Sequence, residues 1–116
     1  MIRINNIEFD SGKAGLKGKK TFILDRVAQI LMKYPDYRVE IGGHTDNVGS
    51  MKKNLALSMD RAENVYKYLA VRGVSKNRLS YRGFAYKFPI ADNRTAGGRR
   101  KNRRVEFILL KGGYKN

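Results

Sequence analysis

The chain has 116 residues, no cysteine, one histidine, and 25 Lys and Arg against 10 Asp and Glu, which gives a formal net charge of +15. This length suits one domain with its own core, and the lack of cysteine excludes a disulfide framework and a thiolate metal site. Because the sequence contains no apolar run of about 18 residues and no charged-then-apolar leader, we expect the chain as given neither to span a membrane nor to direct its own export.

Residues 1–10 predict a first strand, because apolar residues alternate with polar ones in two phases separated by a bulge or turn at Asn5-Asn6. The alternating residues are Ile2, Ile4, Ile7 and Phe9. Residues 11–15 then predict a loop. A helix is predicted from about Leu16 to Tyr34, and Pro35 ends it. We interpret this helix as scaffold.

The start of that helix is strongly basic. It carries Lys13, Lys17, Lys19 and Lys20. The helix macrodipole disfavours positive charge at this end by a few tenths of a kcal/mol per charge. Two interpretations are open, a solvated face and a contact for a polyanion.

The centre of the chain predicts a strand, a polar loop and a second helix in succession. Residues 37–41 alternate apolar and polar side chains as in a half-buried strand, and the glycine-bounded loop 42–49 follows. The helix is predicted from about Met51 to Arg72, with Ser50 as its cap and Gly73 as its stop. Such a junction gathers short polar side chains and backbone N–H groups at a sheet end, where ligands commonly bind.

Spacings of three and four residues assign two stripes to this second helix. The predicted core stripe consists of Leu55, Met59, Ala62, Val65, Tyr66 and Leu69. A neighbouring stripe consists of Asn54, Leu57 or Ser58, and Arg61. Arg61 is therefore expected to point toward the loop and not into the core.

A third strand is predicted in residues 78–84, a long irregular segment in residues 85–101, and a last strand in residues 103–110 with a frayed tail after it. The order is strand, helix, strand, helix, strand, loop, strand. This order favours an α/β fold, a two-layer α+β sandwich with crossover helices packed on one face of a mixed sheet. We expect residues 1–116 to form a single domain.

Asp46 in the loop and Arg61 on the helix carry opposite charges that can converge on one pocket. A pocket holding both would suit a zwitterion, with its ammonium at Asp46 and its carboxylate at Arg61. The alternative is a simple ion pair between the two side chains, and spacing alone does not decide between them.

Several blocks of the sequence resemble the OmpA-like domain, the peptidoglycan-binding module of outer membrane protein A, the Pal lipoprotein and the MotB stator protein. The blocks are Gly43-His44-Thr45-Asp46-Asn47-Val48-Gly49, Asn54, Leu57-Ser58-Met59-Asp60-Arg61-Ala62, Gly73-Val74, Pro89-Ile90-Ala91-Asp92-Asn93 and Asn102-Arg103-Arg104-Val105-Glu106. They agree in order and spacing over nearly the whole chain. The resemblance implies non-covalent peptidoglycan binding by a piece of a larger envelope protein, located in the periplasm and tethered to the outer membrane.

The resemblance also implies which residues bind the ligand. It assigns the amino and carboxylate groups of diaminopimelate, in the peptide stem, to Asp46 and Arg61. We therefore expect Arg61→Ala to abolish binding and leave the fold intact. The further candidates that the matching blocks supply are Thr45, Asn54, Leu57 and Arg104.

Phe9 and Asp10 are second-tier candidates, because the family carries a similar pair leading into a loop that borders the pocket. Their alternative roles are a core aromatic and an aspartate that begins a loop. In the last strand Arg103 and Arg104 alternate, so only one can face the pocket, and the family favours Arg104.

The high positive charge also admits nucleic acid or another polyanion as a partner. Residues 94–104 contain six cations, Arg94, Arg99, Arg100, Lys101, Arg103 and Arg104. The chain departs from the family in having Gly97 where an acid is usual and in adding Arg100 and Lys101. Nucleic-acid binding is not favoured, because most aromatic residues lie on faces suited to packing. Anionic envelope polymers remain a second partner class.

Catalysis is set aside. His44 and Asp46 lie two residues apart, and the only hydroxyl nucleophiles nearby are Ser50 and Ser58 on the helix. The loop supplies no metal-ligand cluster, and the phosphate-binding and dinucleotide-binding glycine motifs are absent from the sequence. We therefore expect a binding module without cofactor or metal.

Overall fold

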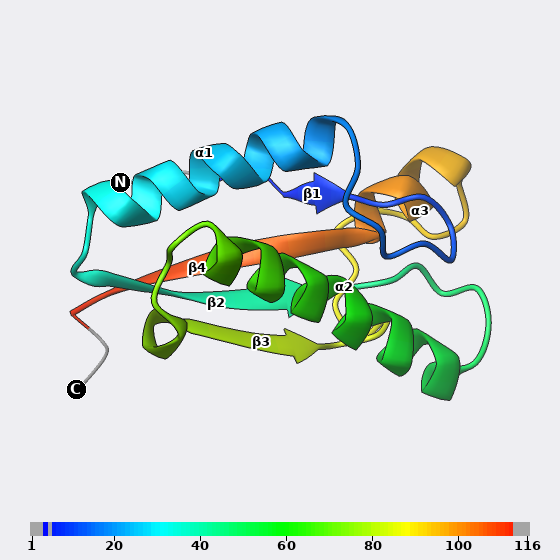
Figure 1. Ribbon diagram of the computed structural model, residues 1–116. Coiled ribbons are helices and arrows are strands. Elements are labelled where there is room, and N and C mark those ends of the chain that lie inside the picture. The colour runs from blue at the N-terminus through cyan, green and yellow to red at the C-terminus, as the bar shows by residue number, and fades with distance from the viewer. Residues whose placement is uncertain (1–3, 5, 113–116) are drawn as a thin grey trace.

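The structure, a computed structural model, describes residues 4 and 6–112. Its elements in chain order are β1 (Ile7–Glu8), α1 (Lys19–Lys33), β2 (Tyr37–Gly43), α2 (Met51–Val71), a 3₁₀ turn (Lys76–Arg78), β3 (Leu79–Gly83), α3 (Ala96–Asn102) and β4 (Arg104–Lys111). Figure 1 shows α1 and α2 running along the sheet, with α3 and the loop after β1 at one end. The predicted alternation of strands and helices is confirmed. No helix within the described residues is long and apolar enough to span a bilayer.

The four strands form one mixed sheet in the order β1-β4-β2-β3. β2 and β3 are parallel neighbours joined through α2, whereas β4 is antiparallel to both β1 and β2. This confirms the predicted mixed sheet with a crossover helix. The carboxyl ends of β2 and β3 and the start of β4 therefore meet at one end of the sheet, where Gly43 pairs with both Gly83 and Val105.

The core lies between one face of the sheet and the two long helices. Val39 of β2 pairs with Leu79 and Leu109, and Ile41 pairs with Tyr81 and Phe107. These positions share a face because side chains alternate along strands. They join buried helix residues in one cluster, to which α1 contributes Leu24, Val27, Ala28 and Leu31, and α2 contributes Ala62, Val65 and Leu69.

Some predicted boundaries were wrong. β1 has only two residues, and the part of the predicted first strand that includes Ile2 lies outside the described residues. α1 begins at Lys19, after Gly18, whose positive φ of 61° places it outside the helix. Lys111 belongs to β4, so the predicted tail begins later, and residues 113–116 lie outside the described part of the chain.

The segment predicted to be irregular contains a short helix, α3. Thr95 caps it, since its hydroxyl oxygen accepts a hydrogen bond from the Gly98 N–H at 2.9 Å. The Gly97-Gly98 pair argued against a helix on propensity. Glycine is required at position 98 because a Cβ there would overlap the carbonyl group of Asp92. Close packing therefore overrides the weak propensity.

The predicted caps of α2 are confirmed, but the predicted phase of its first half is wrong. Ser50 Oγ accepts a hydrogen bond from the Lys53 N–H at 3.2 Å, and Gly73 ends the helix with φ 103°. Leu55 and Met59 are exposed by 42% and 38%. The buried positions in this half are instead Asn54, Ser58 and Arg61.

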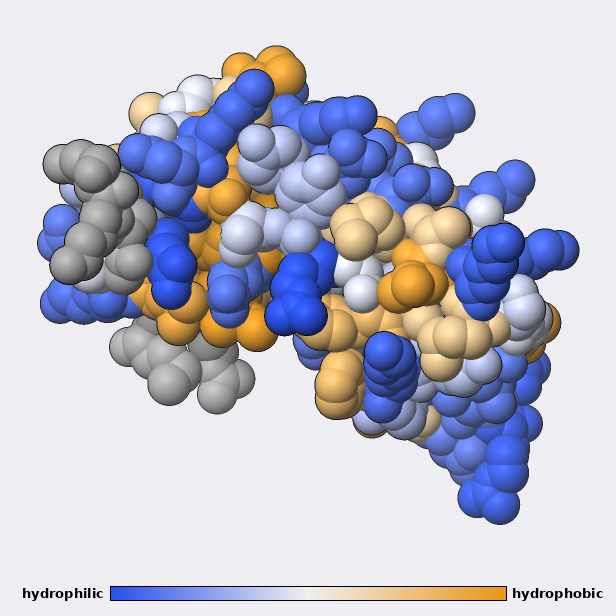
Figure 2. Space-filling model, turned by 90° about the horizontal axis from the view of Figure 1, so that it is seen from below, coloured by the Kyte–Doolittle hydropathy of each residue, from blue (hydrophilic) through white to orange (hydrophobic). Residues whose placement is uncertain are grey.

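The physical reason for this phase is the close approach of α2 to the sheet. A Cβ on Gly43 would overlap the Ser58 carbonyl oxygen, and one on Gly83 would collide with the backbone of Met59. Only small or polar side chains fit between the helix and these glycines, so the apolar Leu55 and Met59 face outward. Figure 2 shows hydrophobic areas set among hydrophilic ones on the face seen from below.

Candidate binding pocket

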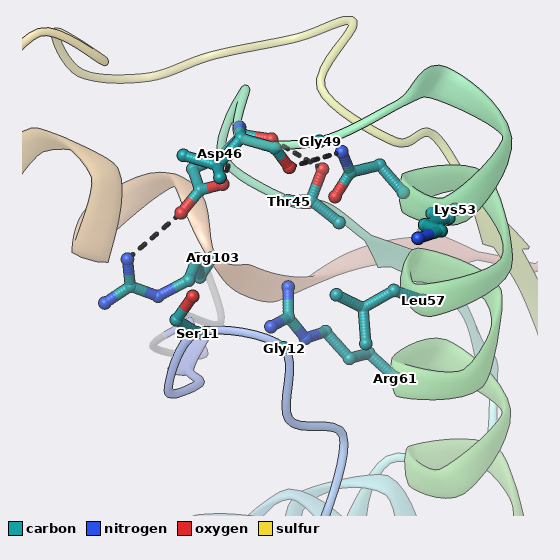
Figure 3. Close-up of a pocket in the computed structure, with 11 residues that line it drawn as sticks. Ser11, Gly12, Thr45, Asp46, Gly49, Lys53, Leu57, Arg61 and Arg103 are labelled. Atoms are coloured by element: carbon teal, nitrogen blue, oxygen red, sulfur yellow. Dashed lines mark hydrogen bonds and ion pairs between the residues drawn. The ribbon is translucent and has the colours of Figure 1, made fainter.

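A pocket of about 190 Å³ opens at the carboxyl end of β2. Its walls come from the loop after β1, the loop between β2 and α2, the first turns of α2, and the start of β4 (Figure 3). The lining residues are Ser11, Gly12, Thr45, Asp46, Val48, Gly49, Lys53, Asn54, Leu57, Arg61 and Arg103. Five of the eight predicted site residues thus line one pocket, namely Thr45, Asp46, Asn54, Leu57 and Arg61.

Asp46 is the one acid in the lining and is 5% exposed. Its Oδ1 accepts a hydrogen bond from the Val48 N–H at 3.0 Å, and its Oδ2 accepts one from Arg103 Nη1 at 3.1 Å. A carboxylate has about four acceptor positions. The Asp46 side chain is therefore held in place by the protein and keeps capacity for an additional donor.

Arg61 is completely buried and binds backbone carbonyl groups. Its Nε donates to Lys13 O at 2.7 Å, its Nη1 to His44 O at 2.9 Å, and its Nη2 to Asp10 O at 3.0 Å. It thereby ties the loop after β1 to the loop after β2. These bonds use three of the five guanidinium N–H groups, and two keep no acceptor among the described residues.

The structure does not show an ion pair between Asp46 and Arg61. The ion-pair partner of Asp46 is Arg103. Burial lowers the pKa of Arg61 to about 10, an effect that Asp46 opposes and Arg103 reinforces. Arg61 therefore remains charged at neutral pH. The lining holds three cations, Lys53, Arg61 and Arg103, and one carboxylate, so the pocket carries an excess of two positive charges.

The burial of Arg61 changes one expectation from the sequence. We expected Arg61→Ala to leave the fold intact. Because the side chain is the common donor for carbonyl groups of two loops, its removal would leave these carbonyls without a partner. Arg61 is therefore both a wall of the pocket and a structural residue.

Thr45, Asn54 and Leu57 shape the pocket in different ways. The Thr45 hydroxyl donates to Asp46 O at 2.8 Å, and Asn54 Nδ2 donates to Val48 O at 2.8 Å and to Ser50 O at 3.1 Å. The amide of Asn54 thus fixes the loop that carries Asp46. Leu57 is half-buried and supplies apolar surface.

Phe9 and Asp10 lie behind the pocket and do not line it. Phe9 is a buried core residue whose ring lies 5.1 Å from Arg61 Cζ. Asp10 contributes its backbone carbonyl to Arg61, and its side chain is not in the lining. Their alternative roles, a core aromatic and a loop aspartate, describe their positions better.

The expected position of Arg104 is wrong, because Arg103 faces the pocket instead. Arg103 donates from Nε to Phe9 O at 2.8 Å and from Nη1 to Asp46. Arg104 points to the other face of the sheet, where it pairs with Glu106 at 3.0 Å and donates to Phe88 O at 3.0 Å. The sequence contained a signal for this orientation. Val105 is an apolar core residue two positions after Arg103, and residues two apart in a strand share a face, so Arg103 and not Arg104 lies on the core side of the sheet.

On that other face, the buried His44 and Arg104 form a cluster with the half-buried Glu106. His44 Nε2 lies 2.9 Å from Glu106 Oε1, and its ring stacks on Phe84 with centroids 5.2 Å apart. Burial and the nearby Arg104 lower the pKa of His44 to about 4, although Glu106 opposes the shift. The imidazole is therefore neutral at pH 7, and only the carbonyl group of His44 reaches Arg61.

The sequence analysis missed six lining residues, Ser11, Gly12, Val48, Gly49, Lys53 and Arg103. Val48 and Gly49 lie within the loop that was identified, and Lys53 directly precedes Asn54. Ser11 and Gly12 follow the Phe9-Asp10 pair. Proximity in sequence to the predicted residues would have found most of them.

Comparisons with known proteins point to one family. The sequence pattern of the OmpA family matches residues 8–103. The chain is 41% identical over 105 residues to "Probable lipoprotein YiaD" of Escherichia coli, covering 90% of this chain and 48% of that protein. It is 45% identical over 103 residues to "Peptidoglycan-binding protein ArfA" of Mycobacterium tuberculosis, covering 89% of this chain and 32% of that protein. The chain thus spans about half or less of these relatives.

Solved structures show the same fold. The C-terminal domain of Helicobacter pylori MotB superimposes with a TM-score of 0.88 at 28% identity, covering 96% of this chain and 88% of that one. The peptidoglycan-associated lipoprotein from Burkholderia pseudomallei gives a TM-score of 0.86 at 27% identity, covering 90% of this chain and 89% of that one. With the family pattern matched over most of its length and the fold shared, the chain belongs to the OmpA family.

Proposed function

We propose that this chain is a non-catalytic peptidoglycan-binding domain that takes the diaminopimelate of the peptide stem into the Asp46 pocket. The observation that carries the proposal is that one fixed carboxylate and two arginines line the same space of about 190 Å³. A related protein is named for peptidoglycan binding, which supports the polymer as ligand.

The pocket chemistry supports a zwitterionic end group. Asp46 is fixed by Val48 and Arg103 and can accept from an ammonium group. The unused N–H groups of Arg61 and Arg103 can donate to a carboxylate, and charge-assisted bonds of this kind are among the stronger polar interactions. The excess of two positive charges favours a ligand with more carboxylates than amines, as a peptide stem containing diaminopimelate provides.

The proposed setting is the periplasm, with the domain on the cell wall and a tether to the outer membrane supplied by a part of the protein not included in this chain. Relatives named as outer membrane proteins and lipoproteins support this setting. Its role would be to anchor an envelope protein to the wall.

Co-sedimentation with purified insoluble sacculi tests the proposal. Wild type should sediment with sacculi, and Asp46→Asn should remain largely in the supernatant, because the variant keeps the shape of the side chain and loses its charge. Asp60→Asn is the matched control, since Asp60 is an exposed acid on α2 outside the pocket and its loss changes the net charge equally. Equal sedimentation of all three proteins would contradict the proposal.

A further inference from the structure

The outward side of α1 carries an exposed stripe that contains three basic residues and an aromatic ring. Residues at spacings of three and four form it, namely Lys19, Phe22, Arg26, Gln29 and Lys33, and all are exposed. It lies opposite the buried Leu24, Val27, Ala28 and Leu31. We call these five residues the outer stripe. It is about 21 Å long at 1.5 Å per residue, and Figure 1 shows α1 at the outside of the fold.

The outer stripe combines positive charge with an exposed aromatic ring. It holds three cations and no acid, and none of the three cations is in an ion pair among the described residues. Phe22 is 76% exposed. Lys13 and Lys17, both exposed, extend the positive surface beyond the helix start. Within the described residues, the three cations of the stripe therefore have no carboxylate at ion-pair distance.

The start of α1 adds to this local imbalance. Its first turn contains Lys19 and Lys20 and no acid, and Gly18 provides no side-chain cap. The helix dipole is unfavourable to these lysines. A negatively charged surface outside the protein would compensate both the dipole and the lysines.

We propose that the outer stripe docks on the surface of an anionic lipid bilayer, with α1 lying parallel to the membrane plane. A basic helix face with an exposed phenylalanine matches helices that lie in the interface of anionic membranes. The phosphate groups of duplex nucleic acid or of a soluble polymer would satisfy the cations, but such partners offer no apolar layer into which Phe22 can insert. The bilayer accounts for both features.

This inference stands apart from the proposed function. No residue of the outer stripe lines the Asp46 pocket. Membrane docking would therefore neither require peptidoglycan nor block the pocket, and pocket variants such as Asp46→Asn should bind vesicles as wild type does.

Vesicle co-sedimentation at fixed salt tests the charge component. The probes are vesicles of phosphatidylglycerol mixed with phosphatidylcholine, and vesicles of phosphatidylcholine alone. The triple variant Lys19→Gln, Arg26→Gln, Lys33→Gln should bind the anionic vesicles at least about tenfold more weakly than wild type, since each basic residue near such a surface contributes roughly fivefold. The control triple Lys52→Gln, Lys76→Gln, Lys87→Gln removes the same charge elsewhere and should lose about threefold or less.

A tryptophan reporter tests insertion of the stripe. The chain contains no tryptophan, so Phe22→Trp gives a single indole signal. Its emission should shift to the blue on adding anionic vesicles, because the ring leaves water. Ile108→Trp is the control, since Ile108 is 49% exposed and points away from the helix-covered face of the sheet. Its emission should not change.

Three results would each overturn the inference. The first is equal loss of vesicle binding in the two triple variants, which would indicate net charge alone. The second is the absence of a blue shift for Phe22→Trp at vesicle concentrations that sediment the protein. The third is binding to duplex DNA without any binding to anionic vesicles. Circular dichroism of every variant would establish that the fold is retained.

Discussion

The two ends of the sheet each hold a buried arginine that ties separate segments together, and at one end this arginine lines the Asp46 pocket. At one end Arg61 donates to carbonyl oxygens of two loops. At the other, Arg78 donates from Nε to Tyr37 O at 2.7 Å and from Nη2 to Leu31 O and Tyr34 O, both at 2.8 Å. The two side chains make the same kind of contact, and both are buried.

What differs is the set of neighbours. Arg61 lies in a pocket wall with Asp46 and Arg103, whereas Arg78 has no carboxylate within ion-pair distance among the described residues. A guanidinium that binds backbone carbonyls is thus a structural device at both ends. We propose that the capacity to bind a ligand depends on the added carboxylate, the second arginine and the open space.

The largest expected effect tests the structural role that Arg61 and Arg78 share. Arg61→Ala and Arg78→Ala should each lower the free energy of unfolding by about 3 to 5 kcal/mol, because each leaves several carbonyl groups without a donor and removes a large buried side chain. Urea unfolding followed by circular dichroism measures this. Arg100→Ala, at an exposed position, should stay within about 0.5 kcal/mol of wild type. An Arg61→Ala protein as stable as wild type would show that the two arginines are not equivalent.

The second prediction concerns pH at the pocket end alone. The pKa of His44 is about 4 in the folded protein, below the ordinary 6.5. The unfolded chain therefore binds the proton first, so stability from this group is full above pH 6.5 and is lost as pH falls toward 4. Between pH 7 and 5 the loss should be about 2 kcal/mol.

The measurement for His44 is urea unfolding at pH 7 and pH 5. His44→Gln removes the titrating group and should show a smaller loss between the two pH values than wild type. If both proteins lose the same stability over this interval, His44 does not titrate as its burial implies.

The third prediction separates the adjacent arginines of β4. Arg103→Gln should weaken binding of a diaminopimelate-containing stem peptide about tenfold, or 1.4 kcal/mol, because a donor near the carboxylate and the partner of Asp46 are both lost. The control is Arg82→Gln, at an exposed position outside the pocket. Calorimetric titration gives both affinities, and an unchanged Kd for Arg103→Gln would remove Arg103 from the ligand site.

The smallest expected effect concerns the cations of α3. Neutralising Arg99, Arg100 and Lys101 together should weaken sacculus binding by only about threefold at low salt, because Arg100 and Lys101 are exposed, Arg99 is half-buried, and charges at the surface act through a screened field. The difference should fade as the Debye length falls from about 10 Å to 3 Å with added salt. A loss as complete as that of Asp46→Asn would mean that the pocket is not the main determinant.

Much of the fold could be predicted because local pattern and tertiary structure agree. Val39 and Ile41 alternate in a strand whose inner face is buried, and Ser50 and Gly73 mark the ends of α2 by capping chemistry alone. The loop that carries Asp46 was located in the same way, at the junction between that strand and that helix.

The wrong predictions concern residues whose positions are set by packing between segments that lie far apart in the sequence. Leu55 and Met59 have the spacing of core residues, but the approach of α2 to Gly43 and Gly83 leaves no space for them. Arg61 was expected at the surface of the pocket, and its burial depends on carbonyls about 50 residues away in sequence. Sequence spacing along one helix does not contain this information.

The central claim is that the pocket recognises a zwitterion, with the ammonium at Asp46 and the carboxylate at the arginines. Calorimetric titration of two stem peptides at fixed salt tests it most directly, one with diaminopimelate and one with lysine, which keeps the amine and lacks the carboxylate. The diaminopimelate stem should bind wild type at least about tenfold more tightly than the lysine stem, and Asp46→Asn should bind both weakly. Equal affinity of wild type for the two stems, or undiminished binding by Asp46→Asn, would contradict the claim.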